Sequence, residues 1–217
     1  MIKNNSNYYL NLFKKYGESP KSLGWSKGKQ FLRYNQLTRD CTLKNSSFLD
    51  VGCGFGDFAS YLKIQKDWKT INYLGIDLID EFLNIANKNH PERNFRFSKE
   101  DFWDTDLNEK FDYVISSGVF NLKNESKNQY NVIKSFIEKM LCYSKKSISI
   151  DFLSDKVEYG HEHSFHSNPS KILSLAYEFS KNISLSNDYF PFEFTLRINK
   201  DDNFDKETTI FNSLQKR

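Results

Sequence analysis

Short apolar runs alternate along the chain with longer segments in which apolar residues recur at helical spacing. The runs are rich in Phe, Ile, Val and Tyr, a composition typical of strands buried in a sheet, and the longer segments predict amphipathic helices. This alternation predicts an α/β fold with a mostly parallel sheet and helices on both faces. The expected strands span residues 48–51, 73–77, 95–100, 111–118, 147–153, 183–190 and 192–198, and the expected helices between them span 57–66, 79–88, 127–143 and 169–180.

The two ends of the chain depart from this alternation. The last two expected strands are separated only by Pro191, which predicts an antiparallel hairpin that closes a seven-stranded sheet. Two helices, at 6–16 and 29–38, precede the first strand. No repeat or second domain is evident, so we expect one domain over 1–217, with a segment at 1–45, a core at 46–200 and a polar tail at 201–217.

Composition narrows the class of protein. Among the 217 residues, 31 are basic and 28 are acidic, a balance of +3 that does not predict a nucleic-acid partner. The sequence has no long apolar run and no signal peptide, so we expect a cytoplasmic protein without a membrane partner. Cys41, Cys53 and Cys142 lack the spacing of a metal site and are interpreted as reduced thiols.

A glycine-rich turn follows the first expected strand, in the stretch Asp50-Val-Gly-Cys-Gly-Phe-Gly. Glycines at 52, 54 and 56 allow a tight turn whose backbone N–H groups can approach a ligand, and a helix follows at once. This arrangement is typical of a nucleotide-binding βαβ unit. The dinucleotide fingerprint would place its third glycine where this chain has Asp57, and Asp50 precedes the turn. Both features argue against a dinucleotide.

Acidic residues follow the next two expected strands. Asp77 ends the second strand about 25 residues after the glycine turn, close to the roughly 20 expected of an acid that binds a ribose. A carboxylate in that place can accept hydrogen bonds from both ribose hydroxyls. Asp101 and Phe102 follow the third strand, and the fourth begins Phe111-Asp-Tyr-Val.

These four motifs, in this order, resemble those of class I S-adenosylmethionine-dependent methyltransferases. The resemblance implies a Rossmann-like fold, S-adenosyl-L-methionine as cofactor, and an N-terminal segment (1–45) that lies across the cofactor pocket as a lid. It also implies that Asp101 contacts the adenine amino group and that Phe102 packs on the ring. Arg33 could reach the cofactor's carboxylate, although a solvated position on its helix is the alternative. The expected cofactor-binding residues are Asp50, Gly52, Cys53, Gly54, Asp57, Asp77, Leu78, Asp101, Phe102, Ser117, Trp25 and Arg33.

The segment 155–166 holds three of the four histidines. Three interpretations are open: a metal site formed by His161, Glu162, His163 and His166, an exposed loop, or a loop that contacts the substrate. No standard zinc spacing is present, so we expect no metal. The segment follows the carboxyl end of the fifth strand, where α/β sheets bind ligands, and this favours substrate contact. The expected catalytic residues are His163, with Glu162 or Glu193 to orient it, and Tyr159; the expected substrate-binding residues are Phe120, Asn121, His161, His166 and Tyr189.

The wider sequence also resembles a subgroup of small bacterial methyltransferases, some linked to surface-polysaccharide modification. We therefore expect methyl transfer to a small molecule, to an oxygen of a sugar, a phosphate or phosphoramidate, or another metabolite. A nucleic-acid (RNA) methyltransferase is an alternative. Enzymes that methylate exocyclic amino groups usually carry Asp/Asn-Pro-Pro-Tyr after the fourth strand, where this chain reads Ser116-Ser-Gly-Val-Phe. A non-catalytic cofactor-binding subunit is the third hypothesis. The sequence does not indicate the oligomeric state.

Overall fold

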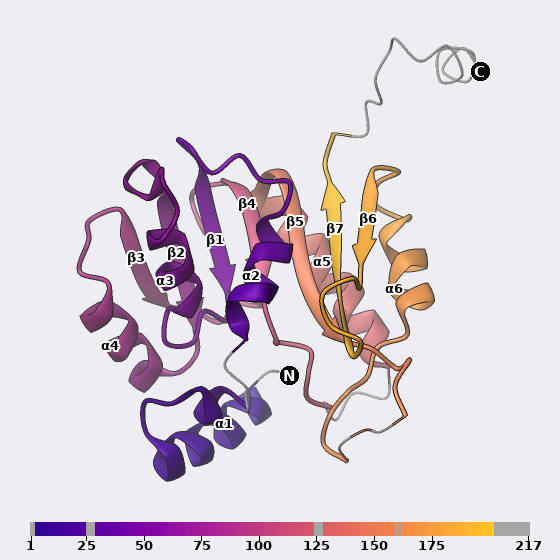
Figure 1. The fold of residues 1–217 in the computed structure, drawn as a ribbon, viewed down its shortest axis with the longest axis horizontal. Helices are drawn as coiled ribbons and strands as arrows, with labels where there is room; N and C mark the ends of the chain where they lie inside the picture. Colours follow the sequence, from indigo (N-terminus) through magenta and orange to yellow (C-terminus); the bar gives the residue numbers. More distant parts are fainter. Residues whose placement is uncertain (1–2, 25–28, 124–127, 159, 161, 202–217) are drawn as a thin grey trace.

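A single mixed sheet of seven strands organises the chain (Figure 1). A computed structural model describes residues 3–24, 29–123, 128–158, 160 and 162–201. The strand order is β3-β2-β1-β4-β5-β7-β6. Strands β1 to β5 are parallel to one another, and β7 pairs antiparallel with both β5 and β6. The predicted fold class is confirmed, including the antiparallel C-terminal pair.

The elements follow the predicted order, with small shifts at their ends. Strand β6 is shorter than the predicted 183–190, because Asn187–Phe192 forms a loop around Pro191, which has no N–H for a sheet ladder. The elements are α1 (Lys3–Tyr16), η1 (Pro20–Leu23), α2 (Gln30–Thr38), β1 (Ser47–Val51), α3 (Asp57–Lys63), η2 (Trp68–Thr70), β2 (Asn72–Asp77), α4 (Asp80–Asn89), β3 (Phe95–Lys99), β4 (Phe111–Ser116), α5 (Gln129–Tyr143), β5 (Ser144–Leu153), α6 (Pro169–Ala176), β6 (Ile183–Ser186) and β7 (Glu193–Asn199).

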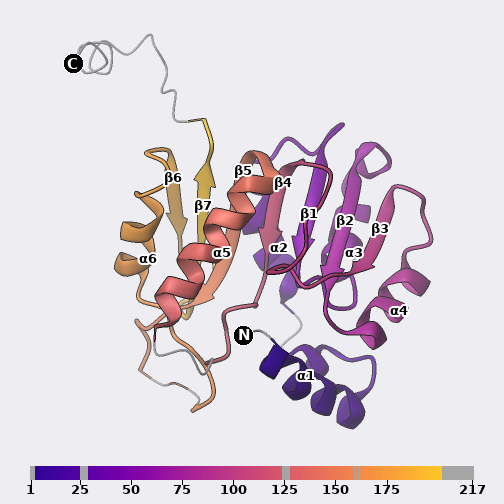
Figure 2. The ribbon, with the colours of Figure 1, turned by 180° about the vertical axis from the view of Figure 1, so that it is seen from behind.

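Helices cover both faces of the sheet, as Figures 1 and 2 show from opposite sides. On one face, α2 and α3 bury an aromatic cluster that includes Tyr34, Phe58 and Tyr73. On the other, α5 and α6 pack on a larger core that includes Phe136 and Phe152. Because neighbouring residues of a strand point to opposite faces, the short apolar runs fill both cores at once.

The carboxyl ends of the parallel strands meet at one edge of the sheet. Helix α1 lies at this edge, below β1 and β2 in the view of Figure 1. The loop between β6 and β7 and the segment between β5 and α6 reach the same edge. Within the described ranges, no helix is both long enough and apolar enough to span a bilayer.

Candidate active site

The glycine-rich turn joins β1 to α3 and is fixed to the neighbouring strand. The backbone N–H groups of Gly52 and Cys53 both donate to the carbonyl of Ile76, at 2.9 and 3.0 Å. Gly52 has a φ of +80°, and a Cβ at this position would lie 2.6 Å from Cγ2 of Val119. Glycine is therefore required at position 52 both by the backbone conformation and by the close approach of the segment after β4.

Asp77, at the end of β2, holds the turn through its carboxylate. One oxygen accepts from the N–H of Gly54 at 2.9 Å, and the other accepts from Leu78 and Ile79 at 2.7 and 3.1 Å. A carboxylate offers about four lone-pair sites, so these three bonds leave about one. The sequence suggested that Asp77 would accept from both ribose hydroxyls. In the structure Asp77 is a clamp on the turn with room for about one further donor, and its bonds to a ribose stay predictions.

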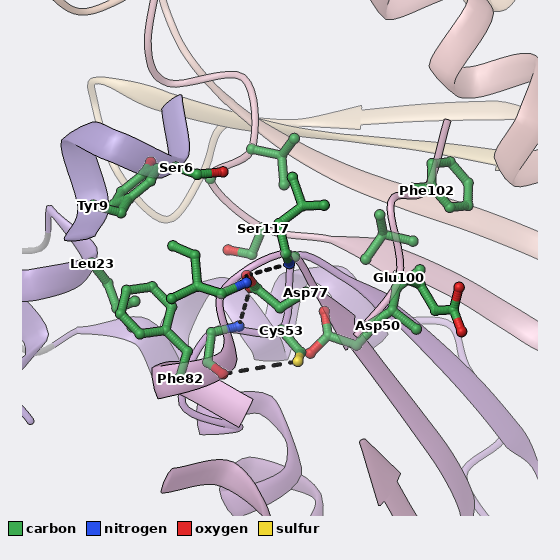
Figure 3. A pocket seen from close by; sticks show the side chains of 18 of the residues that line it. Ser6, Tyr9, Leu23, Asp50, Cys53, Asp77, Phe82, Glu100, Phe102 and Ser117 are labelled. Carbon is green, nitrogen blue, oxygen red and sulfur yellow. Dashed lines mark hydrogen bonds between the residues drawn. The ribbon is translucent and has the colours of Figure 1, made fainter. Parts of the chain in front are cut away.

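A pocket opens above this turn (Figure 3). Its described lining includes five carboxylic acids and contains no Lys, Arg or His. Such a lining attracts a cationic ligand and repels the phosphates of a dinucleotide. S-Adenosylmethionine carries a cationic sulfonium, so the residues present fit it. The lining residues are Ser6, Tyr9, Leu23, Tyr34, Asp50, Val51, Gly52, Cys53, Gly54, Asp57, Ile76, Asp77, Leu78, Ile79, Phe82, Glu100, Asp101, Phe102, Ser117, Gly118 and Val119.

Asp50 is the most deeply buried of these acids, with 3% of its surface exposed. Its carboxylate accepts a hydrogen bond from the hydroxyl of Tyr73 at 2.8 Å. Burial, which penalises the charged form, raises the pKa of Asp50 to about 7, and the carboxylates of Asp77 and Asp57 contribute to the rise. The charge of the pocket therefore changes near neutral pH.

The far end of the pocket is formed after β3. Asp101 accepts from the N–H of Trp103 at 3.1 Å, which leaves its second oxygen available to a ligand among the described contacts. Phe102 lines the pocket and packs edge-on against Phe136, with ring centroids 4.9 Å apart. These positions agree with an adenine site, and the individual contacts to adenine stay predictions.

The N-terminal segment encloses the opposite side of the pocket. Ser6 and Tyr9 of α1, and Leu23 of η1, contribute to its lining (Figure 3). Helix α1 is held there by Phe13, whose ring lies 5.9 Å from that of Phe55 in the glycine-rich turn and 5.7 Å from that of Phe82 in α4. Trp25, predicted to contact the cofactor, lies outside the described residues.

A buried acid that sequence reasoning missed lies beside the pocket. Asp151, on β5, is 2% exposed and accepts from the hydroxyl of Ser117 at 2.5 Å and from the N–H of Gly118 at 2.7 Å. Burial raises the pKa of the Asp151 carboxyl, an effect that the guanidinium of Arg33 partly offsets. In the sequence, Asp151 is one polar residue in an alternating strand, and this pattern alone does not separate a buried acid from a solvated one.

Arg33 has a different environment from either of its predicted ones. It is buried, it is absent from the pocket lining, and its guanidinium donates to both carboxylate oxygens of Glu193. Both carboxylate oxygens of Glu193 thus bind Arg33, and its role in orienting His163 stays a prediction. Tyr189 lies nearby in the loop before β7, where its hydroxyl bonds Thr195 Oγ1 at 2.9 Å.

Two of the predicted substrate-binding residues follow β4. Phe120 is buried in the core between Phe136 and Phe152, and so does not line the pocket. The positive φ of Gly118 (+76°) turns the chain before Phe120 enters the core. Asn121 is half-buried and pairs through its backbone with Phe165.

The histidine-rich segment packs along the residues after β4. His163 is exposed, and its carbonyl accepts from the N–H of Lys123 at 2.9 Å. His166 is half-buried, and its Nδ1 bonds the carbonyl of Ser154 at 2.8 Å. Neither residue lines the pocket, and their roles stay predictions. Tyr159 and His161 lie outside the described residues, and the described part of the chain contains no group of three or more His, Cys, Asp or Glu arranged to hold a metal.

Comparison with known proteins identifies the class of enzyme. Residues 42–147 match the family model "Methyltransferase domain". The predicted methyltransferase Rv1506c of Mycobacterium tuberculosis is 26% identical over 160 residues, which cover 71% of this chain and 93% of that protein. A tRNA (guanine-N(7)-)-methyltransferase of Clostridium botulinum is 35% identical over 86 residues, covering 40% of this chain. Those residues are 34% of the tRNA enzyme, so the match spans about a third of its length.

Solved structures show the same fold. Magnesium protoporphyrin IX methyltransferase from Synechocystis PCC 6803 with bound S-adenosylmethionine has a TM-score of 0.60 at 12% identity, over 89% of this chain and 97% of that one. The complex of DhpI with S-adenosylhomocysteine has a TM-score of 0.64 at 11% identity, over 90% and 95%. The family-model match and the methyltransferase relatives support an S-adenosylmethionine-dependent methyltransferase, and the solved structures share the class I fold. The class and the cofactor expected from the sequence are thus confirmed.

Proposed function

We propose that this enzyme transfers the methyl group of S-adenosylmethionine to an oxygen of a small molecule. One observation carries the proposal: residues of α1 and η1 form part of the pocket wall, so the N-terminal segment covers one side of the cofactor site. A partly covered site favours an acceptor that can enter the remaining opening over one presented on a large, rigid surface. The covering segment thus bears on the acceptor, whereas the acidic lining bears on the cationic cofactor.

Direct transfer is the mechanism that these residues support. The bound cofactor supplies an electrophilic methyl group, so the protein mainly has to hold the acceptor in line with the carbon–sulfur bond. Cys53, the cysteine in the pocket, has a pKa raised by burial and is a poor nucleophile. A chiral methyl group should therefore be transferred with inversion. Retention, or a methylated cysteine, would show a covalent intermediate and contradict direct transfer.

The acceptor class follows from the sequence resemblance to bacterial methyltransferases of surface polysaccharides. We propose a sugar or another metabolite of that biosynthesis, methylated on a hydroxyl, phosphate or phosphoramidate oxygen. The test is a panel of monosaccharides, nucleotide sugars and phosphorylated sugars with labelled S-adenosylmethionine, scored for labelled product. Transfer to a member of this panel supports the proposal.

A tRNA acceptor is the second candidate, because 86 residues resemble tRNA methyltransferases. Bulk tRNA belongs in the same panel as a competing substrate. Preferential labelling of tRNA over every small molecule would overturn the small-molecule proposal and favour this alternative. The net charge of +3 gives no independent support for a polyanionic partner.

A further inference from the structure

The carboxyl ends of β4 and β5 bring Ser117 and Asp151 together at the wall of the cofactor pocket. The two strands are paired in parallel, with Ser116 opposite Ile150, so Ser117 and Asp151 are the next residues in register. Ser117 lines the pocket, whereas Asp151 lies behind it and is almost fully buried. The hydroxyl of Ser117 therefore connects the pocket to the buried carboxylate.

Asp151 holds this part of the wall in place through two bonds. Its two oxygens accept from Ser117 Oγ at 2.5 Å and from the N–H of Gly118 at 2.7 Å. Val119, the next residue, packs close to Gly52 of the glycine-rich turn. The hydroxyl of Ser117 is thus fixed relative to the turn that binds the cofactor.

The charges around Asp151 leave its carboxylate able to accept a proton. Both oxygens of Glu193 accept from Arg33, whose charge also acts on Asp151. The positive charge of Arg33 therefore interacts with two buried carboxylates, those of Glu193 and Asp151. Among the described residues, the titratable and charged groups that interact electrostatically with Asp151 include Arg33 and Tyr34 on α2, Asp50 on β1, Tyr189 before β7 and Glu193 on β7.

We propose that Asp151 accepts the proton of a hydroxyl acceptor through Ser117. The acceptor's oxygen bonds to the methyl carbon, and the carbon–sulfur bond breaks with its electron pair passing to sulfur. The hydroxyl proton of the acceptor moves to Ser117 Oγ while the proton of Ser117 moves to Asp151. Ser117 is the catalytic residue that touches the acceptor, and Asp151 acts through it.

This inference rests on the proposed function and narrows it. A hydroxyl loses a proton on methylation and benefits from a base, whereas a phosphate oxygen is already anionic and would be repelled by this cluster. The acceptor class is therefore a neutral alcohol, such as a sugar hydroxyl. Burial, which raises the pKa of Asp151, also makes its carboxylate a stronger base.

The first test measures whether Asp151 lies close enough to the sulfonium of the bound cofactor for its pKa to respond to that charge. Protein labelled with ¹³C at its aspartate carboxyls is titrated by NMR in complex with S-adenosylmethionine and with S-adenosylhomocysteine. Asp151 should show a pKa lower by about one unit or more in the first complex, because only that cofactor carries the sulfonium charge. Asp112 is the matched control: it also accepts from a serine hydroxyl, Ser47 Oγ at 2.9 Å, but it lies near the opposite end of β4. Equal pKa values of Asp151 in both complexes overturn the proposal.

The second test measures transfer to the matched probes ethanol, ethylamine and ethanethiol. We expect wild-type protein to methylate ethanol, with a rate that falls at low pH as Asp151 becomes protonated. D151N and S117A should lower this rate by about 10²-fold or more, and D112N should not change it. The D151N substitution preserves the fold because the Ser117 hydroxyl can rotate to accept from the new amide.

The outcomes separate this inference from the broader function. Unchanged transfer to ethanol in D151N overturns it, as does wild-type transfer to ethylamine or ethanethiol alone, although the enzyme would still be a methyltransferase. Wild-type protein that binds the cofactor but methylates none of the probes also contradicts a base poised at the methyl group. Failure to bind S-adenosylmethionine at all counts against the proposed function itself.

Discussion

Arg33 and Glu193, 160 positions apart in sequence, form a buried ion pair that joins α2 to β7. The side chains are 9% and 3% exposed, and the Nε–Oε2 distance is 2.6 Å. A second buried arginine, Arg197 of β7, donates to the carbonyls of Gln36 and Leu37 at the other end of α2. Helix α2 is thus fastened at both ends to the strand that completes the sheet.

Breaking the Arg33–Glu193 pair should be costly. R33M leaves Glu193 buried without its partner, and removing one member of a buried pair typically destabilises by about 3–5 kcal/mol. For a chain of this size, each kcal/mol lowers Tm by roughly 2–4 °C. The measurement is thermal unfolding followed by circular dichroism.

The Arg39–Asp188 pair supplies the control, because it connects the same helix to the loop before β7 with side chains 52% and 60% exposed. R39M should cost less than about 1 kcal/mol. The double variant R33M/E193L should recover much of the stability lost in R33M, since it leaves no unpaired charge. Equal losses in R33M and R39M would contradict the importance of burial.

Cofactor affinity should depend on pH through Asp50. Its pKa of about 7 means that the carboxylate is largely neutral at pH values well below 7 and largely charged above it. The charged form attracts a sulfonium, so affinity for S-adenosylmethionine should rise across this range and binding should release protons. S-Adenosylhomocysteine, which lacks the sulfonium, should show a smaller rise. Calorimetry in buffers of different ionisation enthalpy measures both effects.

D50N provides the check on this assignment. Its amide oxygen can still accept from Tyr73, so the fold is kept while the charge is removed, and the pH dependence should flatten. Folding stability should depend on pH in the opposite direction. Because the pKa of Asp50 is higher in the folded protein than in the unfolded chain, its contribution to the free energy of unfolding is present below about pH 4 and is lost as pH rises to about 7. An affinity for S-adenosylmethionine that falls with rising pH would exclude Asp50 as the controlling group.

Asp77 should contribute more to cofactor affinity than Asp80, an exposed acid nearby in the sequence. D77A removes three hydrogen bonds to backbone N–H groups, one of them to the glycine-rich turn. Hydrogen bonds to a charged group contribute roughly 1.5–3 kcal/mol, so cofactor binding should weaken tenfold or more. D80A, at an exposed residue paired with Lys99, should bind normally. Equal cofactor affinity of D77A and D80A in calorimetry would show that the clamp is dispensable.

Gly52 should not tolerate a side chain. In G52A, the new Cβ would lie 2.6 Å from Val119 and would displace that part of the pocket wall. We expect at least a tenfold loss of affinity for both S-adenosylmethionine and S-adenosylhomocysteine. G17A is the matched control, because Gly17 also has a positive φ (+61°) but has no atom within 4 Å of such a Cβ. If both variants bind alike, the close approach of Val119 does not control the pocket.

The sequence predicted the sheet, and motifs that the structure places along the pocket, because these depend on local patterns. The glycine-rich turn, the acid at the end of β2 and the Asp101–Phe102 pair are contiguous stretches whose spacing is set by strand and helix lengths. The burial of Phe120 was not predicted, because a residue after a strand can point to the ligand or to the core.

Contacts between distant segments could not be predicted. The Arg33–Glu193 pair and the Ser117–Asp151 pair depend on which strands become neighbours and in what register. Asp151 stands in a strand where alternate polar residues suggest a solvated face, yet α2 covers that face and buries it. Neither pairing leaves a signal in one sequence without the three-dimensional arrangement.

The strand order also has a consequence for synthesis on the ribosome. Strand β7 lies between β5 and β6, yet it is the last of the seven to be translated. Until it emerges, the nascent chain presents one edge of β5 without a partner, and Arg33 lacks Glu193. An open edge of this kind favours pairing with other chains. The outer edge of β5 and the buried Arg33–Glu193 pair are therefore completed only after β7 has been translated.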